Sequence, residues 1–148
     1  MASTVNATVS IQATGQNNLT TGGISYSGKI AKLYEAALSA TSSPVVNKMY
    51  FATLSVTTSQ TLVLNNGSLT DGYGEALTFT NVVYLSLHNN DASKTFTVGG
   101  GSNALIPAIS LTAGGTLALK STLAVSGAFN LVLAVTGTAS IDVLILGN

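Results

Sequence analysis

Cysteine is absent from this 148-residue chain, so neither a disulfide framework nor a thiolate metal site can form. Arginine and tryptophan are also absent, and charged residues make up only 7% of the chain, against about 25% in an ordinary soluble domain. Five lysines balance five carboxylates, and the formal net charge is zero. A nucleic-acid binder needs a clustered basic face to neutralise phosphates, so this composition excludes nucleic acid as a partner.

Long apolar runs are missing as well. The most apolar stretch, Phe129 to Leu146, is interrupted by Asn130, Gly137 and Asp142, whereas a membrane span needs about 18 uninterrupted apolar residues. The N-terminus has neither the basic region nor the apolar region of a secretory signal peptide. We therefore expect no membrane partner, and we expect any export to use another route such as cell lysis.

With so few charges, the surface must be covered largely by Thr, Ser, Asn and Gly. Low charge weakens the repulsion that keeps proteins apart, so such a surface suits extensive contact with neighbouring chains. The alternative is a β-sandwich that is simply rich in small polar residues and has no partner.

The segment from Leu69 to Asn90 is typical of the centre of an all-β domain. It opens with a polar turn, Asp71 to Glu75, whose glycines allow positive φ at little cost. Alternation follows, with Leu77 and Phe79 predicted on one face. The next strand is apolar on both faces, with Val83, Leu85 and Leu87 opposing Val82, Tyr84 and Ser86. This pattern predicts a central strand.

Short strand patterns recur at roughly even spacing along the rest of the chain. The segment Met49–Val56 is apolar on both faces and predicts a second central strand. Pro107 cannot donate to a ladder, so it predicts an edge or a bulge. We therefore predict an all-β fold, a single antiparallel β-sandwich or jelly-roll-like domain over residues 1–148.

The N-terminal region allows more than one structure. Alternation from Val5 to Ala13 predicts a half-buried strand, residues 15–23 predict a polar loop, and residues 1–23 together predict an N-terminal arm or an edge strand. Helical spacing occurs at Ile30, Leu33, Ala37 and Leu38. The same residues could continue an edge strand from Ile24, so residues 30–38 are predicted as a short helix or an irregular strand.

Residues with catalytic potential are few. His88 is the only histidine, and with Asp71 or Asp91 and a serine it could complete a hydrolase triad. No nucleophile-elbow motif accompanies it, and a polar residue at a strand end explains it more simply. The glycines 99–101 lack the Lys-Ser/Thr of a phosphate loop and predict a flexible hairpin tip. We therefore predict that the protein is not an enzyme.

The turn after Leu69 carries the candidate contact residues. Asp71 and Glu75 could ligate calcium, but a turn held by the Asp71 side chain explains the same residues, so we predict no metal and no cofactor. Tyr73 lies between two glycines and is predicted to point outward, where its ring could stack on a sugar or a neighbouring chain. Packing of the ring over its own turn is the alternative. Tyr26 is a second candidate for an exposed aromatic contact.

The order of several motifs resembles a group of tailed-bacteriophage structural proteins. These motifs are SLTDGYGEALTFTNVVYLSLHNNDASKTFTVGGGSN from Ser68 to Asn103, ISLTAGGTLAL from Ile109 to Leu119 and SIDVLILG from Ser140 to Gly147. Two elements of the group, an aromatic-aspartate pair and Pro-Asp-Ala-x-Gly-Tyr, are replaced here by MYFATLS and KSTLAVSGAFN. Any contacts made by those elements would differ in this chain.

The resemblance implies a virion structural protein, a capsid decoration protein that is a homotrimer and binds the major capsid protein. It would reside in the virion after assembly in the cytoplasm of a bacterial host. The alternatives are a carbohydrate-binding or adhesive β-sandwich, which would use Tyr73 and Tyr26, and a self-assembling shell or tube subunit.

Overall fold

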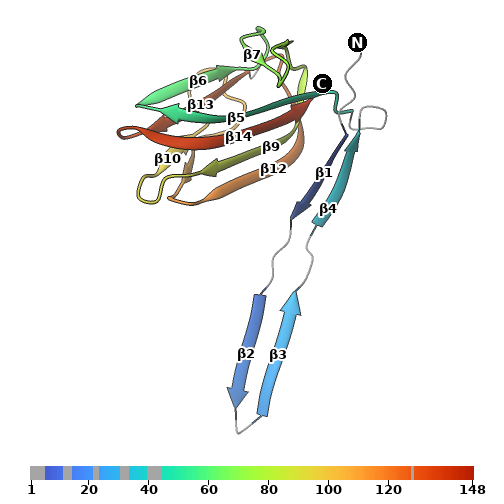
Figure 1. The fold of residues 1–148 in the computed structure, drawn as a ribbon, viewed down its shortest axis with the longest axis vertical. Helices are drawn as coiled ribbons and strands as arrows, with labels where there is room; N and C mark the ends of the chain where they lie inside the picture. Colours follow the sequence, from blue (N-terminus) through green and yellow to red (C-terminus); the bar gives the residue numbers. More distant parts are fainter. Residues whose placement is uncertain (1–5, 12–14, 22–23, 31–33, 40–44, 128) are drawn as a thin grey trace.

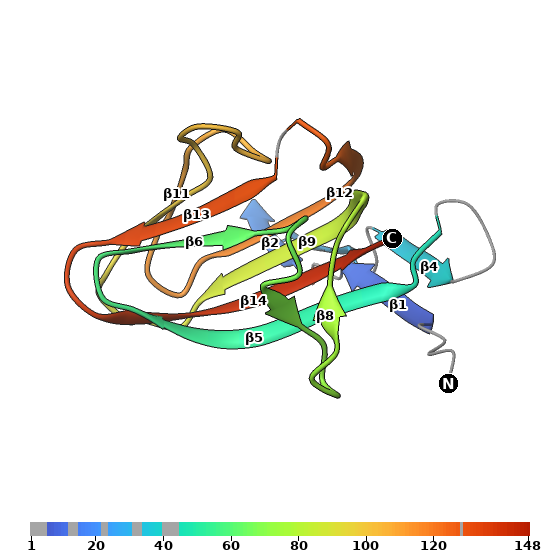
Figure 2. The same ribbon diagram turned by 90° about the horizontal axis from the view of Figure 1, so that it is seen from above.

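The structure is a computed structural model that describes residues 6–11, 15–21, 24–30, 34–39, 45–127 and 129–148. All regular structure in these residues is β, with no helix. Two antiparallel sheets pack face to face and form a β-sandwich (Figures 1 and 2). The predicted all-β sandwich is therefore confirmed, and the helical alternative for residues 30–38 is wrong where the chain is described.

Each sheet of the sandwich has four strands in the described part of the chain. The long sheet has the order β12-β9-β14-β5 and consists of β5 (Lys48–Val56), β9 (Asn81–Asn89), β12 (Thr116–Ala124) and β14 (Ala139–Gly147). The short sheet has the order β11-β10-β13-β6 and consists of β6 (Ser59–Val63), β10 (Phe96–Val98), β11 (Ile109–Leu111) and β13 (Asn130–Val135). A small hairpin of β7 (Leu69–Thr70) and β8 (Ala76–Leu77) lies beside β5.

The core lies between the two sheets and follows the period-2 pattern of the strands. Ile141, Val143 and Ile145 of β14 are fully buried, and they face Leu131 and Leu133 of β13 across the sandwich. Burial of each such side chain stabilises the fold by about 1.5–3 kcal/mol. Leu77 and Phe79 are also buried, as the alternation predicts.

Two strands test the predictions of central position. The strand β9 lies between β12 and β14, so its predicted central position is confirmed. The prediction for β5 is wrong, because β5 is the edge strand of the long sheet. Its second apolar face is exposed rather than covered, and a sequence pattern cannot distinguish these two cases.

A register shift changes the faces at the start of β9. Tyr84 pairs with Leu146 while Val82 pairs with Gly147, so Val83 is the extra residue of a bulge. Val82 therefore joins the main core, and Val83 joins a second cluster on the outer face. The predicted grouping of Val83 with Leu85 and Leu87 is wrong for this reason.

Asn89, at the end of β9, is a fully buried polar residue. Its Nδ2 donates hydrogen bonds to the carbonyl oxygens of Lys94 (2.7 Å), Leu111 (3.2 Å) and Thr112 (2.9 Å). Its Oδ1 accepts from the backbone N–H of Asp91 at 3.0 Å. The side chain thus connects β9 to the loops that enter and leave the short sheet, and satisfies backbone groups that burial would otherwise leave unpaired.

Four strands near the N-terminus form two ladders. β1 (Asn6–Ile11) pairs with β4 (Tyr34–Ser39), and β2 (Gly15–Thr21) pairs with β3 (Ile24–Ile30). The predicted strand at residues 5–13 is confirmed over β1, and its remaining residues lie outside the described part. The predicted polar loop at residues 15–23 is wrong over β2, because cross-strand pairing gives this polar segment a strand conformation. Figure 1 shows both ladders extending away from the sandwich.

The glycines after β10 are packed rather than placed at a flexible tip. Gly99, Gly100 and Gly101 have φ of 78°, 73° and 84°. A Cβ on Gly99 would lie 2.5 Å from the carbonyl oxygen of Pro107, so the loop closes directly onto this backbone. After Pro107 the chain enters β11, an edge strand of the short sheet, which confirms the predicted edge.

We predict that Gly99→Ala destabilises the fold by about 2–4 kcal/mol, because it adds both a positive-φ penalty and an overlap with Pro107. Urea denaturation measures the change. Gly72→Ala is the matched control, since a Cβ there meets nothing within 4 Å, and we expect its effect to stay within about 0.5 kcal/mol. Equal stability of the two variants would contradict the close packing at Gly99.

Candidate functional site

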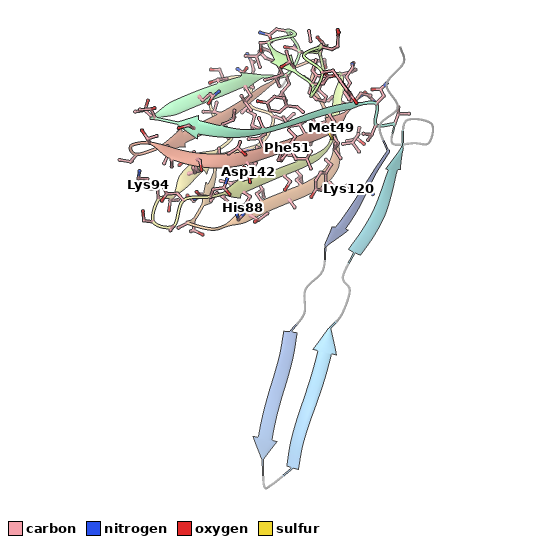
Figure 3. All side chains as sticks on the ribbon, viewed as in Figure 1. Met49, Phe51, His88, Lys94, Lys120 and Asp142 are labelled. Carbon is pink, nitrogen blue, oxygen red and sulfur yellow. The ribbon has the colours of Figure 1, made fainter. Side chains whose placement is uncertain are left out.

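Three large apolar side chains are strongly exposed within residues 45–127 and 129–148. They are Met49, Phe51 and Tyr73, which are 44%, 63% and 87% exposed. Met49 and Phe51 are two residues apart in β5 and therefore lie on the same face of the long sheet (Figure 3). Tyr73 lines the same cleft as Met49. The exposed apolar side chains therefore gather at one place.

The strand register explains how this apolar surface is built. Phe51 pairs with Leu144 of β14, and Met49 pairs with Leu146. Leu146 in turn pairs with Tyr84 of β9, and these two side chains pack with Val46 and Val83 on the outer face. We call Met49, Phe51, Leu144 and Tyr73 the apolar site. It is the exposed margin of a small second cluster whose centre is already buried.

The β7–β8 turn holds Tyr73 in position. The Asp71 carboxylate accepts hydrogen bonds through Oδ1 from the backbone N–H groups of Tyr73 and Glu75, both at 2.9 Å. Gly74 supplies the positive φ of 86° that the turn requires. This geometry confirms that the Asp71 side chain organises its own turn and that Tyr73 points outward.

A cleft of about 370 Å³ separates this turn from the beginning of β5. It is lined by Asn47, Lys48, Met49, Asp71, Gly72, Tyr73 and Leu77. Lys48 also donates a hydrogen bond from Nζ to the carbonyl oxygen of Thr78. The cleft therefore combines an aromatic ring and a thioether with polar groups of both charges.

A polar row crosses the outer face of the long sheet next to the apolar site. Thr53, Asp142, His88 and Thr116 are successive partners on β5, β14, β9 and β12. The Thr53 hydroxyl donates to Asp142 Oδ1 at 2.6 Å, and His88 Nδ1 lies 2.8 Å from Thr116 Oγ1. Figure 3 shows His88 and Asp142 on neighbouring strands of this face.

The polar row perturbs one carboxyl group. The hydrogen bond from Thr53 lowers the pKa of Asp142, and the Asn90 side chain and the charge of His88 lower it further. The ionised form is therefore favoured in the folded protein. Its contribution to stability is present above the ordinary pKa of 3.8 and is lost as the pH falls through the lowered value.

The structure brings together only part of the predicted set of contact residues. Asp71, Tyr73 and Glu75 share the β7–β8 turn, whereas Tyr26 lies in β3, far from this turn in Figure 1. His88 faces Asp142 rather than Asp71 or Asp91. The Asp91 carboxylate instead accepts from the backbone N–H groups of Ser93 and Lys94 at 2.8 Å, which lowers its pKa.

Sequence reasoning missed the contributions of Met49, Phe51 and Leu144. The available signal is the apolar pattern on both faces of β5, which by itself predicts a central strand. Within the described residues, no group of three or more His, Asp and Glu side chains could hold a metal ion.

We predict that Thr53→Val raises the pKa of Asp142, because it removes the hydrogen bond that most favours the ionised carboxyl group. NMR titration of the carboxyl carbon measures the midpoint. Ser55→Ala, on the same face of β5, is the control and should leave the midpoint unchanged. An unchanged midpoint in Thr53→Val would show that the hydrogen bond does not perturb Asp142.

Comparison with known proteins adds no family. No protein-family model, no curated protein and no solved structure matches the chain. The described residues contain no helix that is long and apolar enough to cross a membrane. The surface geometry of the sandwich is therefore the main basis for a functional proposal.

Proposed function

We propose that this protein is a virion structural protein, a decoration protein that stabilises a bacteriophage head through non-covalent contacts with the major capsid protein. The observation that carries the proposal is the exposure of Met49 and Phe51 on the outer face of the long sheet. Contiguous exposed apolar side chains with a polar margin are typical of protein interaction surfaces. The order of motifs that resembles tailed-phage structural proteins supports the choice of partner.

The apolar site has the features of an interface centre. Full burial of a phenylalanine stabilises a complex by about 1.5–3 kcal/mol, and aromatic anchors commonly dominate binding energy. Phe51 lies beside Leu144, which is already half-buried, so a partner would extend an existing cluster. The polar row of Thr53, Asp142 and His88 would lie at the rim of such an interface.

The edge position of β5 adds backbone groups to this surface. No described strand pairs with the free edge of β5. The β7–β8 hairpin and the cleft lie beside the first residues of β5. The later residues of β5, towards Val56, lie further from the hairpin and the cleft. An extended capsid segment could therefore pair with this part of β5 while its side chains cover Phe51.

The proposed mechanism requires no active site. A protein that binds only assembled capsid subunits shifts the assembly equilibrium towards the head by mass action. Decoration by a homotrimer would multiply the contacts of each particle and raise the avidity. The protein would act in the virion after assembly in the bacterial cytoplasm.

We predict that Phe51→Asp weakens binding to undecorated heads by about 10- to 100-fold, because it replaces the apolar anchor with a charge that binding would desolvate. Cosedimentation with heads measures the affinity. Thr97→Asp, at an exposed position on the outer face of the short sheet, is the matched control and should bind normally.

Binding of the unmodified protein should change little between low and high salt, because the apolar site carries no charge. Wild-type affinity of Phe51→Asp, or a steep loss of binding with salt, would contradict the proposed interface.

A second candidate function is carbohydrate binding at the cleft. The observation that favours it is the Tyr73 ring, which stands on a turn beside a cleft that also presents Asn47 and Asp71. An aromatic ring stacks on the apolar face of a sugar, and amide and carboxylate groups bind its hydroxyls.

If the cleft binds carbohydrate, we predict that Tyr73→Ala abolishes binding to a glycan array, because it removes the aromatic ring on which the sugar stacks. Tyr73→Phe is the control and should retain binding, since the ring is kept. Absence of glycan binding by the unmodified protein would exclude this candidate and leave the capsid proposal unaffected.

A further inference from the structure

The loop between β6 and β7 contains the one place in the chain where glycine directly follows asparagine, Asn66 and Gly67. Asn66 is exposed, so its side-chain amide is open to water. Gly67 has a φ of 74° and no side chain that could hinder approach to its own backbone nitrogen. The loop therefore places an amide carbonyl, which is an electrophile, next to an unhindered backbone nitrogen.

A hydrogen bond fixes the direction of the Asn66 side chain. The backbone N–H of Ser68 donates to Asn66 Oδ1 at 3.0 Å. The ring closed by this hydrogen bond contains both Asn66 Cγ and the Gly67 nitrogen, so the turn holds the two atoms close together. The same N–H points at the oxygen on which negative charge develops when a nucleophile adds to Cγ, and it would stabilise that charge.

The Gly67 nitrogen is also not engaged elsewhere. Within residues 45–127 and 129–148, its N–H donates no hydrogen bond. Two other asparagines differ in this respect from Asn66, because their amide nitrogens are held. Asn89 Nδ2 donates to three backbone carbonyls in the core, and Asn130 Nδ2 donates to the carbonyl oxygen of Ser102 at 3.0 Å. The Asn66 amide can react without loss of such contacts.

We propose that Asn66 is a site of spontaneous covalent modification in the folded protein, by way of a cyclic imide. The Gly67 nitrogen forms a bond to Asn66 Cγ, the bond from Cγ to Nδ2 breaks, and ammonia leaves with the proton of the Gly67 amide. Water then opens the imide. Cleavage at Cγ leaves an aspartate, and cleavage at the backbone carbonyl carbon leaves an isoaspartate. The loop and water supply every atom, so the reaction is independent of the proposed function.

The modification would change both charge and packing. Either product carries a carboxylate in place of a neutral amide, so the formal net charge falls from zero by one unit. Isoaspartate also lengthens the backbone of a loop whose two ends, Leu64 and Leu69, are buried. A Cβ on Gly67 would lie 3.7 Å from Ala76 Cβ in β8. The lengthened loop would therefore alter contacts with the hairpin that carries Tyr73.

The test follows the folded full chain at mildly alkaline pH by mass spectrometry. The unmodified protein should gain about 1 Da per chain, and peptide mapping should place aspartate and isoaspartate at position 66. Asn66→Gln should lose this gain, because its longer side chain must close a larger ring. Asn65→Gln changes the neighbouring exposed amide and is the matched control, which should react as fast as the unmodified protein. Each rise of one pH unit should speed the reaction about 10-fold, because the attacking nitrogen must lose its proton.

Hydroxylamine gives a second readout, because it cleaves a chain at a cyclic imide. Under native conditions it should cut the unmodified protein between residues 66 and 67 and leave Asn66→Gln intact. The folded protein should also react at least as fast as the same chain in urea, since the turn already positions the side chain and the Ser68 N–H. Slower reaction of the folded protein than of the denatured chain would mean that the turn protects Asn66, and it would overturn the inference. An equal mass gain in Asn66→Gln would overturn it as well.

Discussion

The alternation of β14 is the constraint on which the rest of the sandwich depends. Its inward residues, Ile141, Val143 and Ile145, are fully buried, and the strand pairs with β5 on one side and β9 on the other. A shift of one residue would move this whole set to the outer face. Burial of the inward set therefore determines which residues of β5 and β9 stand on the exterior.

The exterior is a direct consequence of that register. Outward residues of β14 change from polar Asp142 to apolar Leu144 and Leu146 along the strand, and the neighbouring strands follow the same gradient. Thr53 and His88 consequently flank Asp142, and Phe51 lies beside Leu144. The end of this outer face that carries Leu144 and Phe51 can therefore form a contact that excludes water. The neighbouring polar row of Thr53, Asp142 and His88 forms the margin of that contact.

The sandwich and the N-terminal ladders are separate parts of the molecule (Figure 1). The apolar site lies on the sandwich, where a buried core and the Asn89 hydrogen bonds hold the two sheets together. The ladders extend away from this core (Figure 1).

The sequence by itself determined the fold class, the alternation of the main core and the turn organised by Asp71, whereas it left open whether Tyr73 points outward or packs over its turn. These depend on local periodicity and turn chemistry, which neighbouring residues specify. Only the tertiary structure decided that β5 is an edge strand, that Val83 is a bulge and that Asp142 faces His88. The strand order, the register shift and the pairing of distant strands depend on contacts between residues far apart in the chain. The same pairing placed Ala37 and Leu38, two of the residues with helical spacing, in β4, because a partner strand outweighs a weak local preference.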